Sequence, residues 1–333
     1  QHWLAKFPTN ELRPSAEFNY AWLHYQAGRD SNAFTLFTNF LARHPTNELA
    51  PRAQFWLGDF YYRQNDMLAA EKAYQHLFQN PNWAAKPLAF QARMMAVRAT
   101  FARQAYGQAA YYITNLIVAC PDELAGEILP EAFFAYGDIL LMQDADPAQP
   151  FKKFEKALGA FDKISLNYPD SPLAPAAWGK KGICLMQWAA AREPQEKDPK
   201  LYDGAIDAFE KAMTFTNVEA AVRSQAEVGL GLAQERQAQQ SPPPKNAELY
   251  KSARTHYLNV LYGKNLNVNK GEKPSLFWQK EAGLYAASLA ESLKDWETAA
   301  SLYKSLIAMF PPLGATLDKK LEKAQEQARP GKK

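Results

Sequence analysis

Small, aromatic and aliphatic residues recur along the chain at spacings of three and four positions. Each copy of the pattern begins with an alanine, which is followed by an apolar residue four positions later and another three beyond that. Seven copies are present: Ala33, Phe37 and Phe40; Ala70, Tyr74 and Leu77; Ala109, Ile113 and Leu116; Ala157, Phe161 and Ile164; Ala205, Phe209 and Ala212; Ala253, Tyr257 and Val260; and Ala299, Tyr303 and Leu306. Side chains at these spacings share one face of an α-helix. The pattern therefore predicts seven helices, which we call second helices.

Prolines predict where most of the second helices end. In five copies a proline follows the last apolar residue by four or five positions: Pro45, Pro81, Pro121, Pro169 and Pro311. A proline has no N–H to donate, and its ring clashes with the preceding turn, so it cannot continue a helix.

A different proline pattern predicts a first helix ahead of each second helix. Four prolines stand seven positions before a small residue, in the pairs Pro14 and Ala21, Pro51 and Gly58, Pro130 and Gly137, and Pro175 and Gly182. Proline suits the first turn of a helix, where its missing N–H is no loss. The polar pairs at 9–10, 46–47 and 170–171 are expected to form turns or caps just upstream. The small residue then lies mid-helix, where a neighbouring helix can approach closely; residues 51–64 are the clearest case.

Two nearly identical segments, 4–12 and 41–49, show that the chain is repetitive. They lie 37 residues apart, a period typical of repeat arrays. Because the first segment matches the end of a repeat, we expect the chain to start inside one. The alanine positions are spaced more closely in the first three repeats than later, which predicts three regions: repeats one to three at 1–122, lengthened repeats four to six at 123–263, and a linker, last repeat, capping helix and basic tail at 264–333.

The longer period of the later repeats has two possible sources. One is polar insertions at the turn between the two helices, around 143–150, 192–200 and 239–246. Insertions at equivalent places in a repeat array emerge along one edge, which is often functional. The other is longer helices joined by solvated turns. A separate polar stretch, 263–275, joins repeats six and seven and is a candidate for a mobile link.

This arrangement of two antiparallel helices, with a small residue in the first, a small-aromatic-aliphatic face in the second and a closing proline, resembles the tetratricopeptide repeat. The resemblance covers nearly the whole chain. It implies an all-α, right-handed superhelical solenoid of about seven degenerate helix-turn-helix repeats, closed by a capping helix near 317–328.

Two segments, 161–171 and 50–62, are similar to the bacterial envelope type of this superfamily, typified by the outer-membrane assembly lipoprotein BamD and the Tol-Pal-associated protein CpoB. That resemblance implies a periplasmic or outer-membrane-associated location in a Gram-negative-type bacterium. A cytoplasmic location is the alternative.

Composition is consistent with a continuous core and with protein partners. Of 333 residues, 47% are hydrophobic and 13% aromatic, which excludes disorder over most of the length. A net charge of +3 gives no electrostatic basis for nucleic-acid binding. The sequence contains no run of about 20 apolar residues, so it predicts no membrane-spanning helix. Cys120 and Cys184 fit no metal spacing and are expected to be unpaired, mostly buried thiols.

The sequence contains no recognisable catalytic or cofactor-binding motif. The five histidines are scattered, none pairs with a glutamate or second histidine at metal-binding spacing, and no P-loop or nucleophile elbow is present. Glu131 and Asp138 share a helix face and are expected to be solvated surface residues. The sequence therefore predicts a protein that is not an enzyme and needs no cofactor or metal.

Candidate partner-binding residues follow from the resemblance, which places the first helices on the concave side of the solenoid. The inward positions are three before, one after and four after the small residue. They give Phe18, Trp22, Tyr25, Phe55, Asp59, Tyr62, Met94, Arg98, Phe101, Phe134 and Asp138. Aromatic anchors beside a few charges suit a peptide-binding groove. Alternatively, these aromatic residues pack between successive repeats.

We expect any such groove in the N-terminal half, because the equivalent positions in the fifth repeat are Gly179, Ile183 and Met186. The leading functional hypothesis is a non-catalytic scaffold that binds a segment of another protein in this groove, plausibly in an envelope assembly. Two alternatives are a helical arm of a larger enzyme, such as a glycosyltransferase or a peptidoglycan-cleaving enzyme, and a structural protein that assembles with itself through its solenoid ends.

Overall fold

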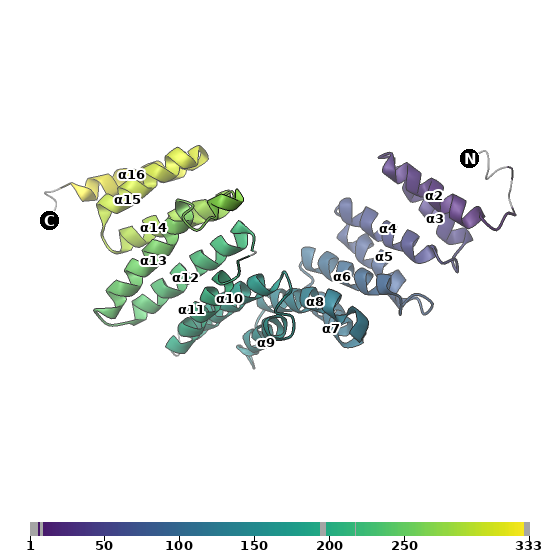
Figure 1. The fold of residues 1–333 in the computed structure, drawn as a ribbon, viewed down its shortest axis with the longest axis horizontal. Helices are drawn as coiled ribbons and strands as arrows, with labels where there is room; N and C mark the ends of the chain where they lie inside the picture. Colours follow the sequence, from purple (N-terminus) through teal and green to yellow (C-terminus); the bar gives the residue numbers. More distant parts are fainter. Residues whose placement is uncertain (1–5, 7–8, 194–197, 217, 330–333) are drawn as a thin grey trace. The chain divides into compact units, whose positions relative to one another are not determined.

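The computed structural model describes residues 6, 9–193, 198–216 and 218–329, and these residues form α-helices without any β-strand. Figure 1 shows the helices following one another along the chain. Their bounds are α2 Arg13–Gln26, α3 Asp30–Arg43, α4 Ala50–Arg63, α5 Met67–Gln79, α6 Pro87–Ala102, α7 Tyr106–Ala119, α8 Asp122–Met142, α9 Lys152–Asn167, α10 Ala174–Arg192, α11 Pro199–Met213, α12 Ala220–Gln240, α13 Lys245–Leu261, α14 Leu276–Ser292, α15 Trp296–Met309 and α16 Gly314–Ala328. Two short 3₁₀ turns lie at Val268–Lys270 and Pro311–Leu313. The predicted all-α class is confirmed.

The chain divides into two compact blocks, residues 1–148 and 149–333, which we call the N-terminal and C-terminal blocks. In the N-terminal block, α2 packs on α3, α4 on α5, α6 on α7, and α8 on α7. In the C-terminal block, α9 packs on α10, and the pairs α10–α11, α12–α13 and α14–α15 follow, with α16 covering α15. These helices match the first and second helices of seven repeats and the capping helix. The three regions inferred from the repeat period stay a prediction.

The second-helix pattern predicts the core of both blocks correctly. All 21 residues of its seven copies are at most 2% exposed. Each of the five helices that precede the closing prolines ends two residues before its proline; α3, for example, ends at Arg43, ahead of Pro45. The spacing rule and the missing N–H of proline therefore account for the position and the end of these helices.

Three of the four prolines expected to open a first helix do so, and the fourth does not. Pro14, Pro51 and Pro175 lie in the first turn of α2, α4 and α10. The expectation for Pro130 was wrong, because α8 begins at Asp122 and Pro130 lies inside it. Pro121 at the N-cap and the acidic residues in the first turn favour the earlier start.

The polar residues upstream of these helices form turns and do not cap the helices. The Asn47 side chain accepts a hydrogen bond from the Leu49 N–H at 2.9 Å, and Ser171 Oγ accepts one from the Leu173 N–H at 3.2 Å. Neither α4 nor α10 has a side-chain cap. These bonds span two residues, the geometry of an Asx or ST turn.

Longer helices account for much of the longer period. The first helices α8, α10 and α12 have 21, 19 and 21 residues, against 14 in α2 and α4. Only residues 241–244 separate α12 from α13, whereas a loop at 143–151 separates α8 from α9. In the other expected insertion, 192–200, residues 194–197 lie outside the described residues.

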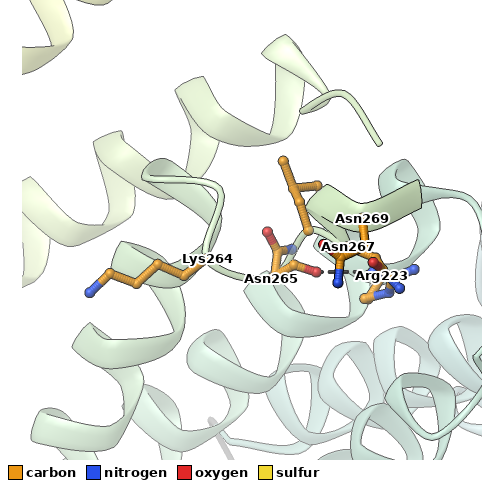
Figure 2. A pocket seen from close by; sticks show the side chains of 6 residues that line it. Arg223, Lys264, Asn265, Asn267 and Asn269 are labelled. Atoms are coloured by element: carbon orange, nitrogen blue, oxygen red, sulfur yellow. Dashed lines mark hydrogen bonds between the residues drawn. The ribbon is translucent and has the colours of Figure 1, made fainter. Parts of the chain in front are cut away.

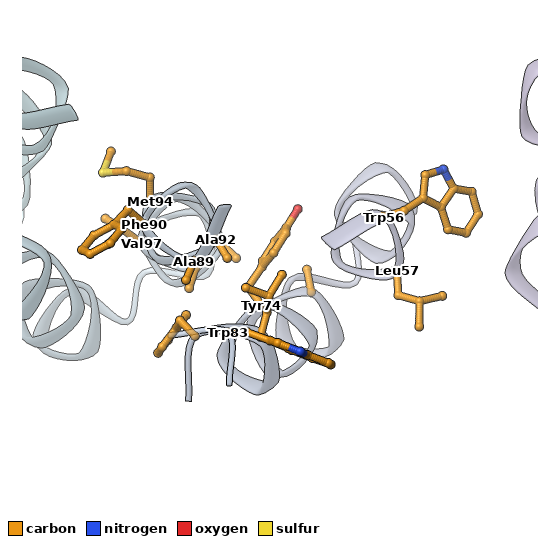
Figure 3. Packing of buried hydrophobic residues seen from close by; sticks show 14 of the residues in the cluster. Trp56, Leu57, Tyr74, Trp83, Ala89, Phe90, Ala92, Met94 and Val97 are labelled. Carbon is orange, nitrogen blue, oxygen red and sulfur yellow. The ribbon is translucent and has the colours of Figure 1, made fainter. Parts of the chain in front are cut away.

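Close helix approach at the small residues is confirmed at Gly58 and Gly182. A Cβ atom on Gly58 would lie 2.3 Å from the ring of Tyr74, and one on Gly182 would lie 2.7 Å from the ring of Phe209. Both rings belong to second helices and are fully buried. Figure 3 shows Tyr74 between α4, which carries Trp56 and Leu57, and α6, which carries Ala89 and Ala92. The Tyr74 ring can therefore pack against α4 because Gly58 has no side chain.

Gly58→Ala is expected to destabilise the N-terminal block by about 2 kcal/mol, because overpacking a fixed ring costs more than the helix propensity that alanine adds. The matched control is Gly159→Ala in α9, where no atom lies within 4 Å of the added Cβ. That substitution is expected to stabilise its helix by about 0.5–1 kcal/mol. Chemical denaturation of both variants measures the difference. Stabilisation by Gly58→Ala would show that Tyr74 can move aside.

Candidate functional site

The first-helix face of the N-terminal block, meaning the side on which α2, α4, α6 and α8 follow one another, carries two pockets. Along this face α4 contacts α6, and α6 contacts α8. The first pocket has a volume of about 250 Å³ and is lined from α2, α4 and α6 by Phe18, Trp22, Tyr25, Arg52, Phe55, Trp56, Asp59, Arg63 and Leu88. The second has a volume of about 310 Å³ and is lined from α4, α6 and α8 by Tyr62, Val97, Arg98, Phe101, Ala102, Glu131, Phe134, Ala135, Asp138 and Ile139.

Aromatic rings in contact with one another and an arginine form the wall of the first pocket. The Tyr25 ring lies 5.3 Å from Trp22 and 5.5 Å from Trp56, measured between ring centroids. The Arg63 guanidinium lies 4.9 Å above the Tyr25 ring and donates a hydrogen bond to its hydroxyl at 2.9 Å. Trp22 is 37% exposed, so an indole surface is available to solvent. Rings fixed in this way offer apolar area at little cost in conformational entropy.

Asp59 brings a fixed carboxylate to the same pocket. The Tyr74 hydroxyl, from α5, donates to Asp59 Oδ1 at 2.6 Å. Burial raises the pKa of Asp59, and the Tyr74 hydrogen bond and the Arg63 charge offset only part of that rise. Because Gly58 makes room for the Tyr74 ring, the same contact between α4 and α5 packs the core and orients the carboxylate.

Asp59→Asn is expected to raise the melting temperature more at neutral pH than at acidic pH. A carboxyl whose folded pKa is raised releases its proton more readily in the unfolded chain, so stability falls as pH rises from the unfolded to the folded pKa. Asparagine keeps an acceptor for the Tyr74 hydroxyl and removes this dependence. Thermal unfolding of the wild-type chain and of the Asp59→Asn variant across about pH 3.5–7 measures this pH dependence. An identical pH dependence in both would contradict the stated origin of the shift.

The second pocket combines an apolar lining with an ion pair at its rim. Arg98 of α6 forms an ion pair with Glu131 of α8, and its other nitrogen lies 3.4 Å from the sulfur of Met95. Tyr62, Phe101 and the remaining apolar residues form most of the wall. Glu131 and Asp138 both line this pocket, and the Glu131 side chain is 43% exposed, which is compatible with the solvated surface position expected for it.

Ten of the eleven predicted binding residues line these two pockets. Phe18, Trp22, Tyr25, Phe55 and Asp59 line the first, and Tyr62, Arg98, Phe101, Phe134 and Asp138 line the second. The exception is Met94, which lines neither pocket and is only 6% exposed in the core. Whether the ten bind a partner stays a prediction.

The alternative, that these aromatic residues pack between repeats, also holds for part of the set. The Tyr25 ring of the first repeat packs edge-on against Trp56 of the second at 5.5 Å. Phe18 is 6% exposed and packs within its own repeat, edge-on against Phe37 at 5.3 Å and Phe40 at 5.7 Å. The sequence pattern missed Arg52, Trp56, Arg63 and Leu88 in the first pocket. An arginine at the end of an aromatic-rich first helix was the available signal for Arg63.

A third pocket lies in the C-terminal block, over the segment expected to be a mobile link. It has a volume of about 480 Å³ and is lined by Arg223, Lys264, Asn265, Leu266, Asn267 and Asn269 (Figure 2). Arg223 donates to both carboxylate oxygens of Glu272, at 2.9 and 3.0 Å, and to the Asn265 carbonyl at 3.0 Å. These bonds attach 263–275 to the start of α12. The ion pair also neutralises the arginine, so the pocket is polar without a free positive charge from Arg223.

The described residues show no group of three or more histidine, cysteine, aspartate or glutamate side chains arranged to hold a metal ion. Among them, no helix combines the length and apolar character that crossing a membrane requires. The two thiols are unpaired; Cys184 is buried and Cys120 is partly so. Burial raises the pKa of Cys184 to about 12, which makes it an unreactive structural thiol.

A sequence profile of the tetratricopeptide repeat matches residues 15–47 and 281–312. The first match covers most of α2 and all of α3, and the second covers the later part of α14 and all of α15. Both matches therefore place a first and a second helix in the register inferred from the sequence. Among curated protein sequences, none matches this chain significantly.

Solved structures share the architecture. A tetratricopeptide repeat protein from Parabacteroides merdae has a TM-score of 0.54 at 12% identity, covering 94% of this chain and 98% of that one. A signal transduction ATPase with numerous domains and a tetratricopeptide repeat sensor, from Pyrococcus horikoshii, has a TM-score of 0.59 at 16% identity, covering 94% of this chain and 44% of that one. Identities this low show the fold alone.

Tetratricopeptide repeats generally form non-catalytic scaffolds for protein–protein interaction, in which stacked repeats present an extended surface. Two segments of this chain thus match the tetratricopeptide repeat, and the helix pairs and the structural likeness show that the chain has the fold of tetratricopeptide repeat proteins.

Proposed function

We propose that the N-terminal block is a scaffold that binds an extended or helical segment of another protein along its first-helix face. One observation carries the proposal: the positions selected by repeat spacing converge on two pockets between successive first helices. A peptide lying across α2, α4, α6 and α8 would meet both pockets in turn.

The chemistry of the pockets indicates what such a segment contains. Trp22 and Tyr25 in the first pocket and Phe101 and Phe134 in the second supply apolar surface for large side chains. Charged groups of both signs stand beside these rings in each pocket, so polar groups of the segment can be oriented as well. We therefore expect a segment with two apolar anchors separated by polar residues. Anchors that enter such pockets carry most of the energy of an interface.

The test is recovery of partners from the native host with a double variant, Trp22→Ala with Tyr62→Ala, which alters one residue of each pocket. We expect at least one partner recovered by the wild-type protein to be lost. Leu68→Ala is the matched control, because Leu68 is a 50% exposed residue on the second helix α5. Circular dichroism checks that all variants keep their helicity. Unchanged recovery by a fully helical double variant would rule out the groove.

We also propose that the partner belongs to a bacterial cell envelope, which places the scaffold in the periplasm or at the outer membrane. The support is the similarity of segments 161–171 and 50–62 to envelope-type repeats. Fractionation of the native host tests this location independently of the groove. Recovery of the protein solely from the cytoplasmic fraction would contradict it and leave the groove proposal intact.

A further inference from the structure

A fourth pocket lies on the side of the N-terminal block formed by the second helices α5 and α7. Its volume is about 360 Å³. Its lining comes from the end of α5, from α6 and from α7: Phe78, Gln79, Arg93, Tyr111, Tyr112, Asn115, Val118 and Ala119. It shares no residue with the pockets of the first-helix face. We call it the Arg93 pocket.

Arg93 is the one charged residue that lines this pocket, and it forms no ion pair with any carboxylate of the described residues. Its guanidinium lies 5.2 Å from the Phe90 ring centroid and 5.5 Å from that of Phe78. Burial lowers the pKa of this half-buried group, yet an arginine stays protonated in proteins. A fixed, partly desolvated positive charge without an acidic partner is therefore available to an anion.

The Glu71 carboxylate, which contacts Tyr112 of this pocket, already has its own partners. It accepts two hydrogen bonds from Arg103, at 3.0 and 2.6 Å, and one from the Tyr112 hydroxyl at 3.0 Å. Arg103 therefore compensates the Glu71 charge, and Arg93 forms no ion pair with it.

The rim of the pocket is apolar and exposed. Tyr111 is 60% exposed and Val118 87% exposed, seven residues apart and so on the same face of α7. Asn115 lies between them in the sequence, and Gln79 lies at the end of α5, so two side-chain amides line the pocket together with the arginine. A ligand for this pocket therefore combines an anionic group with apolar neighbours and polar backbone groups, which is the chemistry of a peptide.

A carboxylate fits the pocket better than a phosphate. One guanidinium matches the charge of one carboxylate and presents two parallel N–H donors to it. A phosphate monoester carries close to two negative charges at neutral pH and needs further cations. The described lining offers no second cation.

We propose that the Arg93 pocket binds an acidic peptide segment of a partner protein, in which one aspartate or glutamate carboxylate pairs with Arg93 and its apolar neighbours pack on Tyr111 and Val118. The scaffold then has two recognition surfaces in its N-terminal block. One accepts large apolar anchors on the first-helix face, and the other accepts a single carboxylate on the second-helix side. The two surfaces can be tested separately because they share no lining residue.

The experiment uses an array of nonapeptides with a central glutamate flanked by leucine, valine or tyrosine. Two matched arrays carry glutamine or phosphoserine at the centre. Labelled full chain is applied to all three, and the dissociation constants of the strongest peptides are measured by fluorescence anisotropy. We expect the glutamate peptides to bind at least about tenfold more tightly than their glutamine counterparts, because only a carboxylate forms a charge-assisted pair with the guanidinium.

Variants test whether the peptides bind at the Arg93 pocket and not at another surface. Arg93→Gln is expected to abolish the preference for glutamate, and Tyr111→Ala to weaken the same peptides without removing the preference. Tyr111 is largely exposed, so its variant remains informative if Arg93→Gln fails to fold. Lys72→Gln is the control, because Lys72 is an exposed cation of α5 that lines none of these pockets, and it is expected to leave the glutamate preference unchanged. Equal binding of glutamate and glutamine peptides, tighter binding of phosphoserine peptides, or no binding on any array would overturn the proposal.

Discussion

Phe209→Ala is expected to lower the free energy of unfolding of the C-terminal block by about 3–5 kcal/mol, the range for removing a fully buried phenylalanine. The ring belongs to α11, is fully buried, and lies against two glycines of different first helices. A Cβ atom on Gly182 of α10 would lie 2.7 Å from the ring, and one on Gly229 of α12 would lie 2.4 Å from it. Removing the ring leaves a cavity bordered by backbone that has no side chains to fill it, so the expected loss is large.

Hydrogen exchange of α10, α11 and α12 under increasing denaturant measures this loss, because repeat arrays can unfold in parts and a single global transition is not assured. Phe277→Ala in α14 is the control: that side chain is 56% exposed, and its removal is expected to cost about 0.5 kcal/mol or less. A loss below 1 kcal/mol for Phe209→Ala would show that α10 and α12 close the cavity themselves.

A second substitution tests whether the glycine and the ring are coupled. Gly229→Ala alone overpacks the site, whereas in the Phe209→Ala background the added methyl group enters the vacated space. The double variant is therefore expected to be more stable than the sum of the two single effects predicts, by about 1–2 kcal/mol. If the two changes in the free energy of unfolding were strictly additive, Gly229 and Phe209 would not be coupled.

The regular part of the fold was predictable because local periodicity and core packing agree. Ala253, Tyr257 and Val260 form a helical face even though no proline closes their repeat, and all three are buried. The same agreement lets the inward positions of the first helices be chosen by counting from the small residue. Positions such as Trp22 and Asp59 then line pockets because neighbouring repeats place them in register.

Prediction failed where a competing helix-start signal or a tertiary contact decides. Pro130 reads as a helix start, yet the signals at 121–123 begin the helix earlier. Met94 obeys the spacing rule but faces the core. The Arg93 pocket draws its residues from three helices, so no local pattern marks it. For Pro130 a competing start signal in the same helix decided, whereas for Met94 and the Arg93 pocket the deciding contacts join residues that are distant in the sequence, which periodicity does not describe.

Arg103→Met is expected to lower the stability of the N-terminal block by roughly 3 kcal/mol, the lower end of the range for breaking a buried ion pair. Glu71 of α5 is 6% exposed, and its carboxylate accepts bonds from Arg103 at the end of α6 and from Tyr112 of α7. Without the arginine, only the Tyr112 hydroxyl still compensates a buried negative charge. We place the effect at the lower end because the Arg103 side chain is 35% exposed, so water can reach the vacated site.

A double variant distinguishes lost charge from lost packing. Glu71→Gln added to Arg103→Met removes the uncompensated charge and keeps an acceptor for Tyr112, so it is expected to restore about half of the lost stability or more, as neutral replacements of buried pairs do. Chemical denaturation of the wild-type chain, the two single variants and the double variant gives the coupling between the two positions. If the double variant is as unstable as Arg103→Met alone, the arginine acts through packing of its methylene groups. Recovery instead shows that the ion pair holds α5, α6 and α7 together by compensating Glu71, which in turn holds Tyr112 at the wall of the Arg93 pocket.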